Sequence, residues 1–147
     1  MNKLYIEENV SSNDIIKEIA IDNNLSNYVV LKNKNGKPYF KGNDIYFNIS
    51  NKDNITVAVT SSKPIGIDIE RLTFKEGVVK HFFRESEQEI IKNSLDKELD
   101  FTTIWVKKEA YIKYLGLDIT SIRKIDTTTI TGFTIKKYQE YIIGIKE

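Results

Sequence analysis

Across residues 65–70 the chain reads Ile65-Gly66-Ile67-Asp68-Ile69-Glu70. This strict alternation predicts a β-strand that is buried on one face. Successive side chains leave a strand on opposite faces, so the three isoleucines share one face and the two acidic residues share the other. Asp68 and Glu70 then stand about 7 Å apart and repel each other unless a cation lies between them. Mg²⁺ suits this position because it prefers oxygen ligands, although an ordinary solvated acidic face gives the same pattern.

The composition is that of an ordinary globular chain of about one domain, with 147 residues, 40% of them hydrophobic and 29% charged. The net charge of +1 argues against a strongly electrostatic nucleic-acid binder. The chain has no cysteine and a single histidine, His81, which excludes thiolate chemistry and multi-histidine metal sites. It has neither a long apolar run nor a signal-peptide pattern, so we expect a cytoplasmic protein that does not bind a membrane.

The first half of the sequence predicts mainly strands. A helix is expected over residues 14–24, preceded by the cap candidates Ser11, Ser12 and Asn13. Short strands are expected near residues 3–6 and 28–32, with a turn at Asn35-Gly36. The strands at 45–50, 55–60 and 65–70 are joined by short turns, which predicts an antiparallel meander.

The second half combines helices with further strands. Helices are expected over 75–83, from a capping box of Ser86 and Glu89 through about residue 93, and from Asp100 or Thr102 through Leu115. Strands are expected over 122–126, 129–137 and 141–145. Together the two halves predict the α+β class.

The helix that ends at Leu115 carries a polar residue within an apolar arc. The arc consists of Phe101, Ile104, Trp105, Tyr111, Ile112 and Leu115. Lys108 lies near its middle, so its ammonium must snorkel to water or meet an anion, unless a bent or shorter helix turns it outward. Glu109 and Lys113 lie at the edge of the arc, where a surface i,i+4 ion pair is the simpler interpretation.

These elements together suggest a chemical site. Two carboxylates on a strand and one on a helix can hold Mg²⁺, and two neighbouring lysines can hold phosphate oxygens. Such a combination suits a phosphoryl-type displacement, in which neutralisation of charge and positioning of the reactants account for most of the rate.

The same stretches resemble the paired signature of the 4′-phosphopantetheinyl transferases. The second part of that signature is Trp105-Val106-Lys107-Lys108-Glu109-Ala110-Tyr111-Ile112-Lys113, and two further motifs are Gly36-Lys37-Pro38 and Phe47-Asn48-Ile49-Ser50. These motifs belong to the larger, surfactin-synthetase-activating type. The resemblance implies two pseudo-symmetric α+β halves with the site at their seam. Residues 1–63 would form a reduced N-terminal half, and residues 64–147 a C-terminal half with the metal-binding and catalytic motifs.

The resemblance also implies an activity, in which phosphopantetheine moves from coenzyme A to a serine of an apo carrier protein and adenosine 3′,5′-bisphosphate is released. The metal, Mg²⁺ or alternatively Mn²⁺, would bind Asp68, Glu70 and Glu109. Glu109 would be the base, and Lys113 would contact the phosphates and protonate the leaving group. The remaining coenzyme A contacts would come from Gly36, Lys37, Pro38, Ser50, Asn51 and Lys108.

The family usually has a histidine where this chain has Asn51. An asparagine can still donate a hydrogen bond but carries no charge, so weaker coenzyme A binding is expected. Two alternatives remain: a degenerate relative that binds coenzyme A or a carrier protein without turnover, and an unrelated Mg²⁺-dependent phosphodiester-cleaving enzyme. The expected partner is an acyl, peptidyl or polyketide carrier protein, and a monomer is expected rather than a homodimer.

Overall fold

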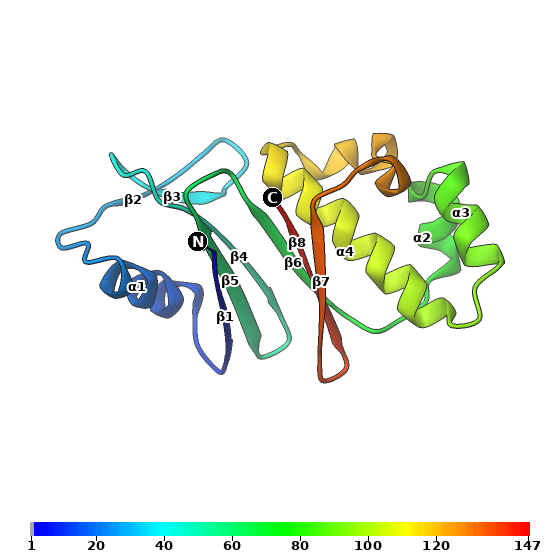
Figure 1. Ribbon diagram of the computed structural model, residues 1–147, viewed down its shortest axis with the longest axis horizontal. Helices are drawn as coiled ribbons and strands as arrows, with labels where there is room; N and C mark the ends of the chain where they lie inside the picture. Colours follow the sequence, from blue (N-terminus) through cyan, green and yellow to red (C-terminus); the bar gives the residue numbers. More distant parts are fainter. Residues whose placement is uncertain (1) are drawn as a thin grey trace.

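The structure, a computed structural model, describes residues 2–147 and has the expected α+β class (Figure 1). Its strands are β1 (Lys3–Glu8), β2 (Val30–Lys32), β3 (Pro38–Phe40), β4 (Tyr46–Lys52), β5 (Ile55–Ser61), β6 (Gly66–Arg71), β7 (Phe133–Tyr138) and β8 (Tyr141–Lys146). Its α-helices are α1 (Ser12–Asp22), α2 (Glu76–Phe82), α3 (Glu85–Lys92) and α4 (Lys97–Leu115), and its 3₁₀ helices are η1 (Ile119–Lys124) and η2 (Thr127–Thr129).

Two three-stranded antiparallel sheets form the centre of the molecule, with the orders β1-β5-β4 and β6-β8-β7. The predicted meander is therefore wrong in its last step: β4 and β5 form a hairpin, but β6 pairs with β8. The reason is that β5 already has β1 on one edge and β4 on the other, which leaves no free edge for β6. The pseudo-symmetry of the two halves stays a prediction.

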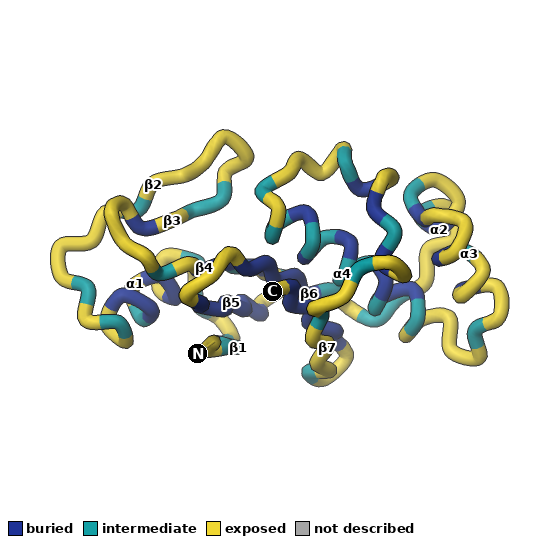
Figure 2. Tube along the Cα trace, turned by 45° about the horizontal axis from the view of Figure 1, so that its top comes forward, coloured by how far each residue is buried: buried dark blue, intermediate teal, exposed yellow. Residues whose placement is uncertain are grey.

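A shared core joins the two sheets. Alternate residues of β5, β6 and β8 pack together, namely Ile55, Val57, Val59, Ile65, Ile67, Ile69, Tyr141, Ile143 and Ile145. The predicted isoleucine face of residues 65–70 is thus confirmed, because all three isoleucines are fully buried. Figure 2 shows this buried run along the adjoining strands, with exposed loops toward the two ends of the molecule. The opposite face of β6 is left for helix α4.

Two glycines let α4 approach that face closely. A Cβ atom at Gly66 would lie 2.1 Å from the backbone oxygen of Ala110, and one at Gly144 would lie 2.9 Å from the Val106 side chain. Gly144 stands opposite Asp68 in the β6–β8 register. On this face of β6, Gly66 thus allows the close approach of α4, and Asp68 and Glu70 carry carboxylates.

We expect Gly66→Ala to be strongly destabilising. The added methyl group would meet backbone, which cannot move aside as a flexible side chain can. Overpacking of this kind costs about 3 kcal/mol at the upper end of its usual range, or roughly 6–12 °C in Tm for a chain of this length. Gly77→Ala in α2 is the matched control, because a Cβ there meets nothing within 4 Å. Thermal unfolding of both variants tests this, and equal Tm values for Gly66→Ala and the wild type would refute it.

Several local predictions need correction. Helix α1 has the expected cap at Ser11, but α3 begins before the predicted Ser86–Glu89 box, and Glu87 accepts from the Arg84 amide instead. Residues 122–126 are not a strand, because Asp118 and Asp126 cap the short helices η1 and η2. Helix α4 starts earlier than predicted, at Lys97, with Asp96 as its N-cap.

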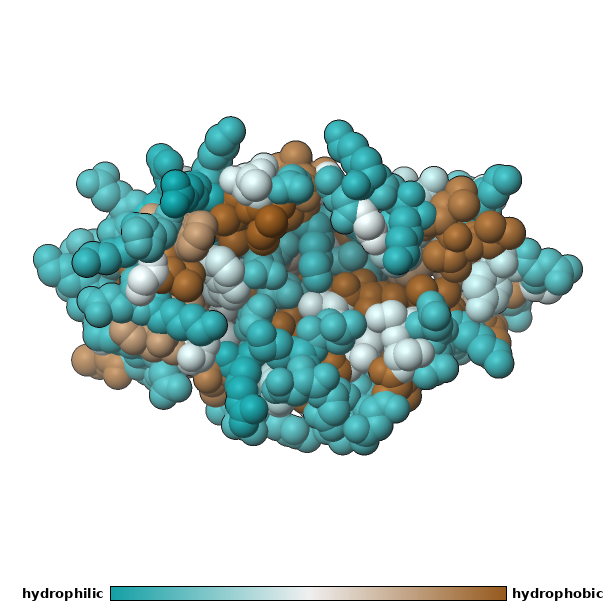
Figure 3. Space-filling model, turned by 180° about the vertical axis from the view of Figure 1, so that it is seen from behind, coloured by the Kyte–Doolittle hydropathy of each residue, from teal (hydrophilic) through white to brown (hydrophobic). Residues whose placement is uncertain are grey.

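The face seen from behind is mostly hydrophilic, with hydrophobic residues gathered in separate patches (Figure 3). Among residues 2–147, no helix has both the length and the apolar character needed to cross a bilayer.

Candidate active site

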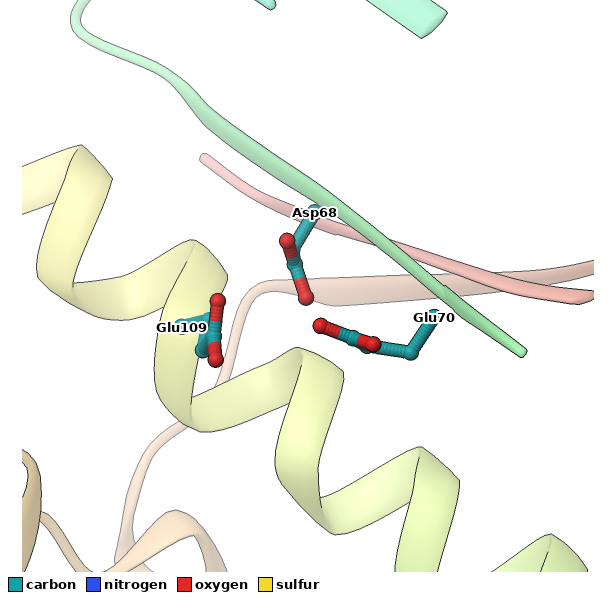
Figure 4. A group of neighbouring side chains, drawn as sticks. All are labelled: Asp68, Glu70 and Glu109. Atoms are coloured by element: carbon teal, nitrogen blue, oxygen red, sulfur yellow. The ribbon is translucent and has the colours of Figure 1, made fainter. Parts of the chain in front are cut away.

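Three carboxylates converge in the space between β6 and α4 (Figure 4). Asp68 and Glu70 come from the strand and Glu109 from the helix. Each offers one oxygen, and these oxygens lie within 4.8 Å of one another. Asp68 is only 3% exposed, while the other two are half-buried. The alternation of β6 and the closeness of α4 together bring these groups to one point.

The charges in this cluster are poorly compensated. Asp68 Oδ1 accepts a hydrogen bond from Ser50 Oγ at 3.1 Å and lies 3.8 Å from Lys113 Nζ. Asp68 Oδ2 is buried and has no hydrogen-bond partner among residues 2–147. Burial, and then the charge of Glu109, raise the pKa of Asp68 well above its usual range. Burial, and then the charge of Glu70, raise the pKa of Glu109. An orphaned oxygen among three carboxylates fits a hard divalent cation.

In the metal-free protein, Asp68→Asn is expected to raise Tm at pH 7, because it removes a buried charge that faces Glu109. A carboxyl whose pKa is raised on folding binds protons better in the folded state, so its charge destabilises the wild type increasingly as the pH rises above about 4. The advantage of the variant should therefore vanish toward that pH.

Thermal unfolding in chelator, at several pH values, measures this difference, and Asp44→Asn on an exposed loop is the control. Added Mg²⁺ should raise the Tm of the wild type but not that of Asp68→Asn. A chelated Asp68→Asn protein that melts below the wild type at pH 7 would contradict the prediction.

Side chains of β4 face β6 across the junction of the two sheets. Asn48 Oδ1 accepts from the Ile67 amide at 2.8 Å, Ser50 donates to Asp68, and Lys52 Nζ lies 3.2 Å from Glu70 Oε2. Neither Asn48 nor Lys52 was predicted to face this strand. Period-2 alternation along 46–52 was the available signal, because residues 48, 50 and 52 must share one face of a strand.

Lys113 connects the carboxylates to a nearby hollow that Lys37 also lines. A pocket of about 200 Å³ is lined by Gly36, Lys37, Pro38 and Lys113, among others. Lys113 Nζ also donates to the Ile49 carbonyl at 3.4 Å. Lys37 Nζ donates to the Ile65 and Lys113 carbonyls at 3.0 Å each. Burial, and then the charge of Lys113, lower the pKa of Lys37 to about 8. An anion bound beside it would favour the charged form.

A larger hollow of about 340 Å³ continues from Lys37 and Pro38 to Tyr114. Its lining adds the aromatic residues Tyr39, Phe40 and Phe47 to the charged residues Lys37 and Asp44. A still larger hollow of about 610 Å³ lies at the turn between α3 and α4, lined by residues such as Ile90 and Leu95, and it includes none of the predicted site residues.

Two of the predicted residues lie apart from the carboxylates. Asn51 is exposed on the other face of β4, and its Nδ2 donates to Ser12 Oγ at 3.3 Å. Lys108 is fully buried, and its Nζ donates to Glu87 Oε1 at 2.7 Å and to the Ile125 carbonyl. The prediction that Lys108 must snorkel or meet an anion is confirmed, and the alternative of a helix that turns it outward is excluded.

Glu87, which the sequence analysis missed, completes this second polar group. Its Oε2 accepts from the Thr127 amide at 3.0 Å and from Thr127 Oγ1 at 2.6 Å. Burial lowers the pKa of Lys108, and the hydrogen bond that Lys108 donates to Glu87 opposes that shift. The pair therefore anchors the side of α4 that faces away from β6.

Comparison with known proteins identifies the family. The family model described as "4′-phosphopantetheinyl transferase superfamily" matches residues 64–145, which include β6 and all of α4. The chain belongs to this superfamily. The matched segment contains all three converging carboxylates and Lys113. Lys108 also lies within it, whereas the remaining candidate residues, from Gly36 to Asn51, lie outside it.

Curated relatives in the superfamily extend the similarity toward the N-terminus. The chain is 36% identical over 105 residues to the 4′-phosphopantetheinyl transferase gsp of Aneurinibacillus migulanus, covering 69% of this chain and 43% of that protein. It is 38% identical over 103 residues to a 4′-phosphopantetheinyl transferase of Bacillus subtilis, covering 62% and 45%. It is also 34% identical over 101 residues to HetI of a Nostoc species, covering 62% and 43%. The chain thus spans less than half the length of these relatives.

Proposed function

We propose that this chain transfers 4′-phosphopantetheine from coenzyme A to a serine of an apo acyl, peptidyl or polyketide carrier protein, releasing adenosine 3′,5′-bisphosphate. The observation that carries the proposal is the convergence of Asp68, Glu70 and Glu109 beside Lys113 in a member of this superfamily. Within this cluster, Asp68 Oδ2 is buried and has no hydrogen-bond partner among residues 2–147. The curated relatives are themselves named 4′-phosphopantetheinyl transferases, which supports the same activity for this chain.

The three carboxylates would hold one Mg²⁺, or Mn²⁺ in its place. Hard oxygen ligands and uncompensated negative charge are what such an ion requires. When bound, the ion would neutralise negative charge on the pyrophosphate of coenzyme A. The side chains of the protein would position the substrates and transfer the protons.

In the proposed reaction, Glu109 takes the proton of the carrier serine directly or through water. The serine oxygen then forms a bond to the phosphorus that bears pantetheine, and the bond from that phosphorus to the leaving bisphosphate breaks. Lys113 contacts the phosphates and donates a proton to the leaving oxygen. The nucleophile belongs to the carrier protein, which agrees with the absence of cysteine from this chain.

Coenzyme A would lie along the hollows that begin at Lys113. Lys37 and Pro38 line both hollows from the β2–β3 hairpin, and Gly36 lines the smaller one. Lys37 would offer its remaining N–H to a phosphate, since it already donates to two backbone carbonyls. Ser50 would act by holding Asp68, with which it shares a hydrogen bond. We also propose that residues 1–63 and 64–147 act as two halves that meet at this site, and the monomeric state stays a prediction.

The experiment measures adenosine 3′,5′-bisphosphate by chromatography after incubation with coenzyme A and Mg²⁺, with and without an apo carrier protein. Transfer predicts release only when the carrier is present, and no release when its acceptor serine is replaced by alanine. Release without a carrier would support a phosphodiester-cleaving enzyme instead. A third outcome is that coenzyme A binds, as measured by calorimetry, but no adenosine 3′,5′-bisphosphate is released with any of several carrier proteins. That result would support a binding protein without turnover.

A further inference from the structure

Lys52 is a cation already positioned at the carboxylate cluster. It is the last residue of β4, and its Nζ lies 3.2 Å from Glu70 Oε2. Its side chain is 43% exposed, whereas that of Glu70 is 18% exposed. The ammonium therefore reaches from solvent to the edge of the cluster and partly offsets the charge of one proposed metal ligand.

The strand pattern fixes this position. Ser50 and Lys52 share a face of β4, and their partners Asp68 and Glu70 share a face of β6. Two side-chain contacts in step thus join the strands, a buried hydrogen bond from Ser50 to Asp68 and a half-exposed ion pair between Lys52 and Glu70. The neighbouring Asn51 points to Ser12 on the other face, away from the carboxylate cluster.

A lysine in this position opposes a divalent cation. Glu70 cannot give its full charge to a metal ion while it pairs with an ammonium, and the ammonium repels the arriving ion. The same ammonium attracts a phosphate group once the metal has taken Glu70. Its long, partly exposed side chain has the freedom to make that change of partner.

We propose that Lys52 makes metal binding depend on the phosphate substrate: it competes with the divalent cation for Glu70, and it contacts the pyrophosphate of the substrate when the cation is bound. This inference rests on the proposed metal site. Lys52 would thereby belong to the metal site, although it lies outside both signature stretches, residues 65–70 and 105–113.

The proposal is tested by comparing the Mn²⁺ and pyrophosphate affinities of Lys52→Gln with those of the wild type. Calorimetric titration with Mn²⁺ alone should show binding to Lys52→Gln that is about fivefold to tenfold tighter than binding to the wild type. Titration of the Mn²⁺-saturated protein with inorganic pyrophosphate should show weaker binding to Lys52→Gln by a similar factor. Tighter Mn²⁺ binding together with weaker pyrophosphate binding indicates that Lys52 exchanges partners, because a general loss of structure would weaken the binding of both ligands.

Two controls separate charge from position. Lys52→Arg keeps the charge and should bind both ligands within about twofold of the wild type. Lys80→Gln removes one positive charge from an exposed position on α2 and should leave both affinities unchanged. Equal Mn²⁺ affinities for Lys52→Gln and the wild type would overturn the role of Lys52 while leaving the metal site intact. Failure of both proteins to bind Mn²⁺ would overturn the metal site, and the role of Lys52 with it.

Discussion

Glu109→Gln is expected to reduce the rate of phosphopantetheine transfer by about 10³-fold, the middle of the range for loss of a general base. Glutamine preserves the shape of the side chain but cannot accept the proton of the carrier serine. It also removes one of the three charges that would hold the metal ion. Both losses act on turnover, so the effect should appear mainly in kcat.

The folded structure should survive this substitution. Glu109 is half-buried in a cluster of like charges, and burial and Glu70 already raise its pKa, so neutralising it relieves repulsion. Mass spectrometry measures the rate of holo-carrier formation, and circular dichroism shows whether the variant is folded. Glu98→Gln, an exposed position in the first turn of the same helix, is the control. A Glu109→Gln protein with wild-type kcat would show that Glu109 has neither role.

Glu87→Gln is expected to have the largest effect on stability. It leaves the ammonium of Lys108 fully buried without a counter-charge. Removing one partner of a buried ion pair typically costs about 3–5 kcal/mol. Chemical denaturation measures this loss, and Glu85→Gln, exposed in the first turn of α3, is the control.

The double variant Glu87→Gln with Lys108→Met separates a structural from a ligand-binding role. If Lys108 serves α4 through Glu87, the double variant should recover much of the lost stability, because methionine removes the buried ammonium that Glu87→Gln leaves without a counter-charge. Coenzyme A affinity should then stay close to that of the wild type. A stable Glu87→Gln protein, combined with loss of coenzyme A binding on Lys108→Met, would instead restore the phosphate-binding role that the sequence suggested.

The strand at the centre of the site was predictable because its signal is local. Alternation over Ile65 to Glu70 fixes which side chains share a face, and the burial of the three isoleucines agrees with it. Its partner strand was not predictable, because pairing depends on which edges remain free after the other strands have assembled. β8 begins seventy residues after β6 ends.

Helix α4 illustrates a second limit. Its sequence predicts one apolar face, but the helix is buried on several sides, against β6 and β8 and against α3 and η1. Val106 and Ala110, outside the predicted arc, are fully buried, whereas Leu115 within it is exposed. The anion that meets Lys108 also lies outside the helix, in a segment where a cap was expected at Ser86 rather than an acceptor at Glu87.

The candidate site shows the same division between local and long-range information. The spacing of Asp68 and Glu70 follows from strand geometry, and the turn of helix between Glu109 and Lys113 follows from helix geometry. The contact of Lys52 with Glu70 arises only from the packing of two sheets that are not joined by a backbone ladder. Such a contact has no signature within a single stretch of sequence.

The most direct test of the proposed function is the intact mass of an apo carrier protein after incubation with this chain, coenzyme A and Mg²⁺. The proposal predicts a gain equal to one phosphopantetheine group, which is lost with chelator, with Glu109→Gln, or when the acceptor serine is replaced by alanine. An unchanged mass across acyl, peptidyl and polyketide carrier proteins, with a folded protein and saturating coenzyme A, would contradict it.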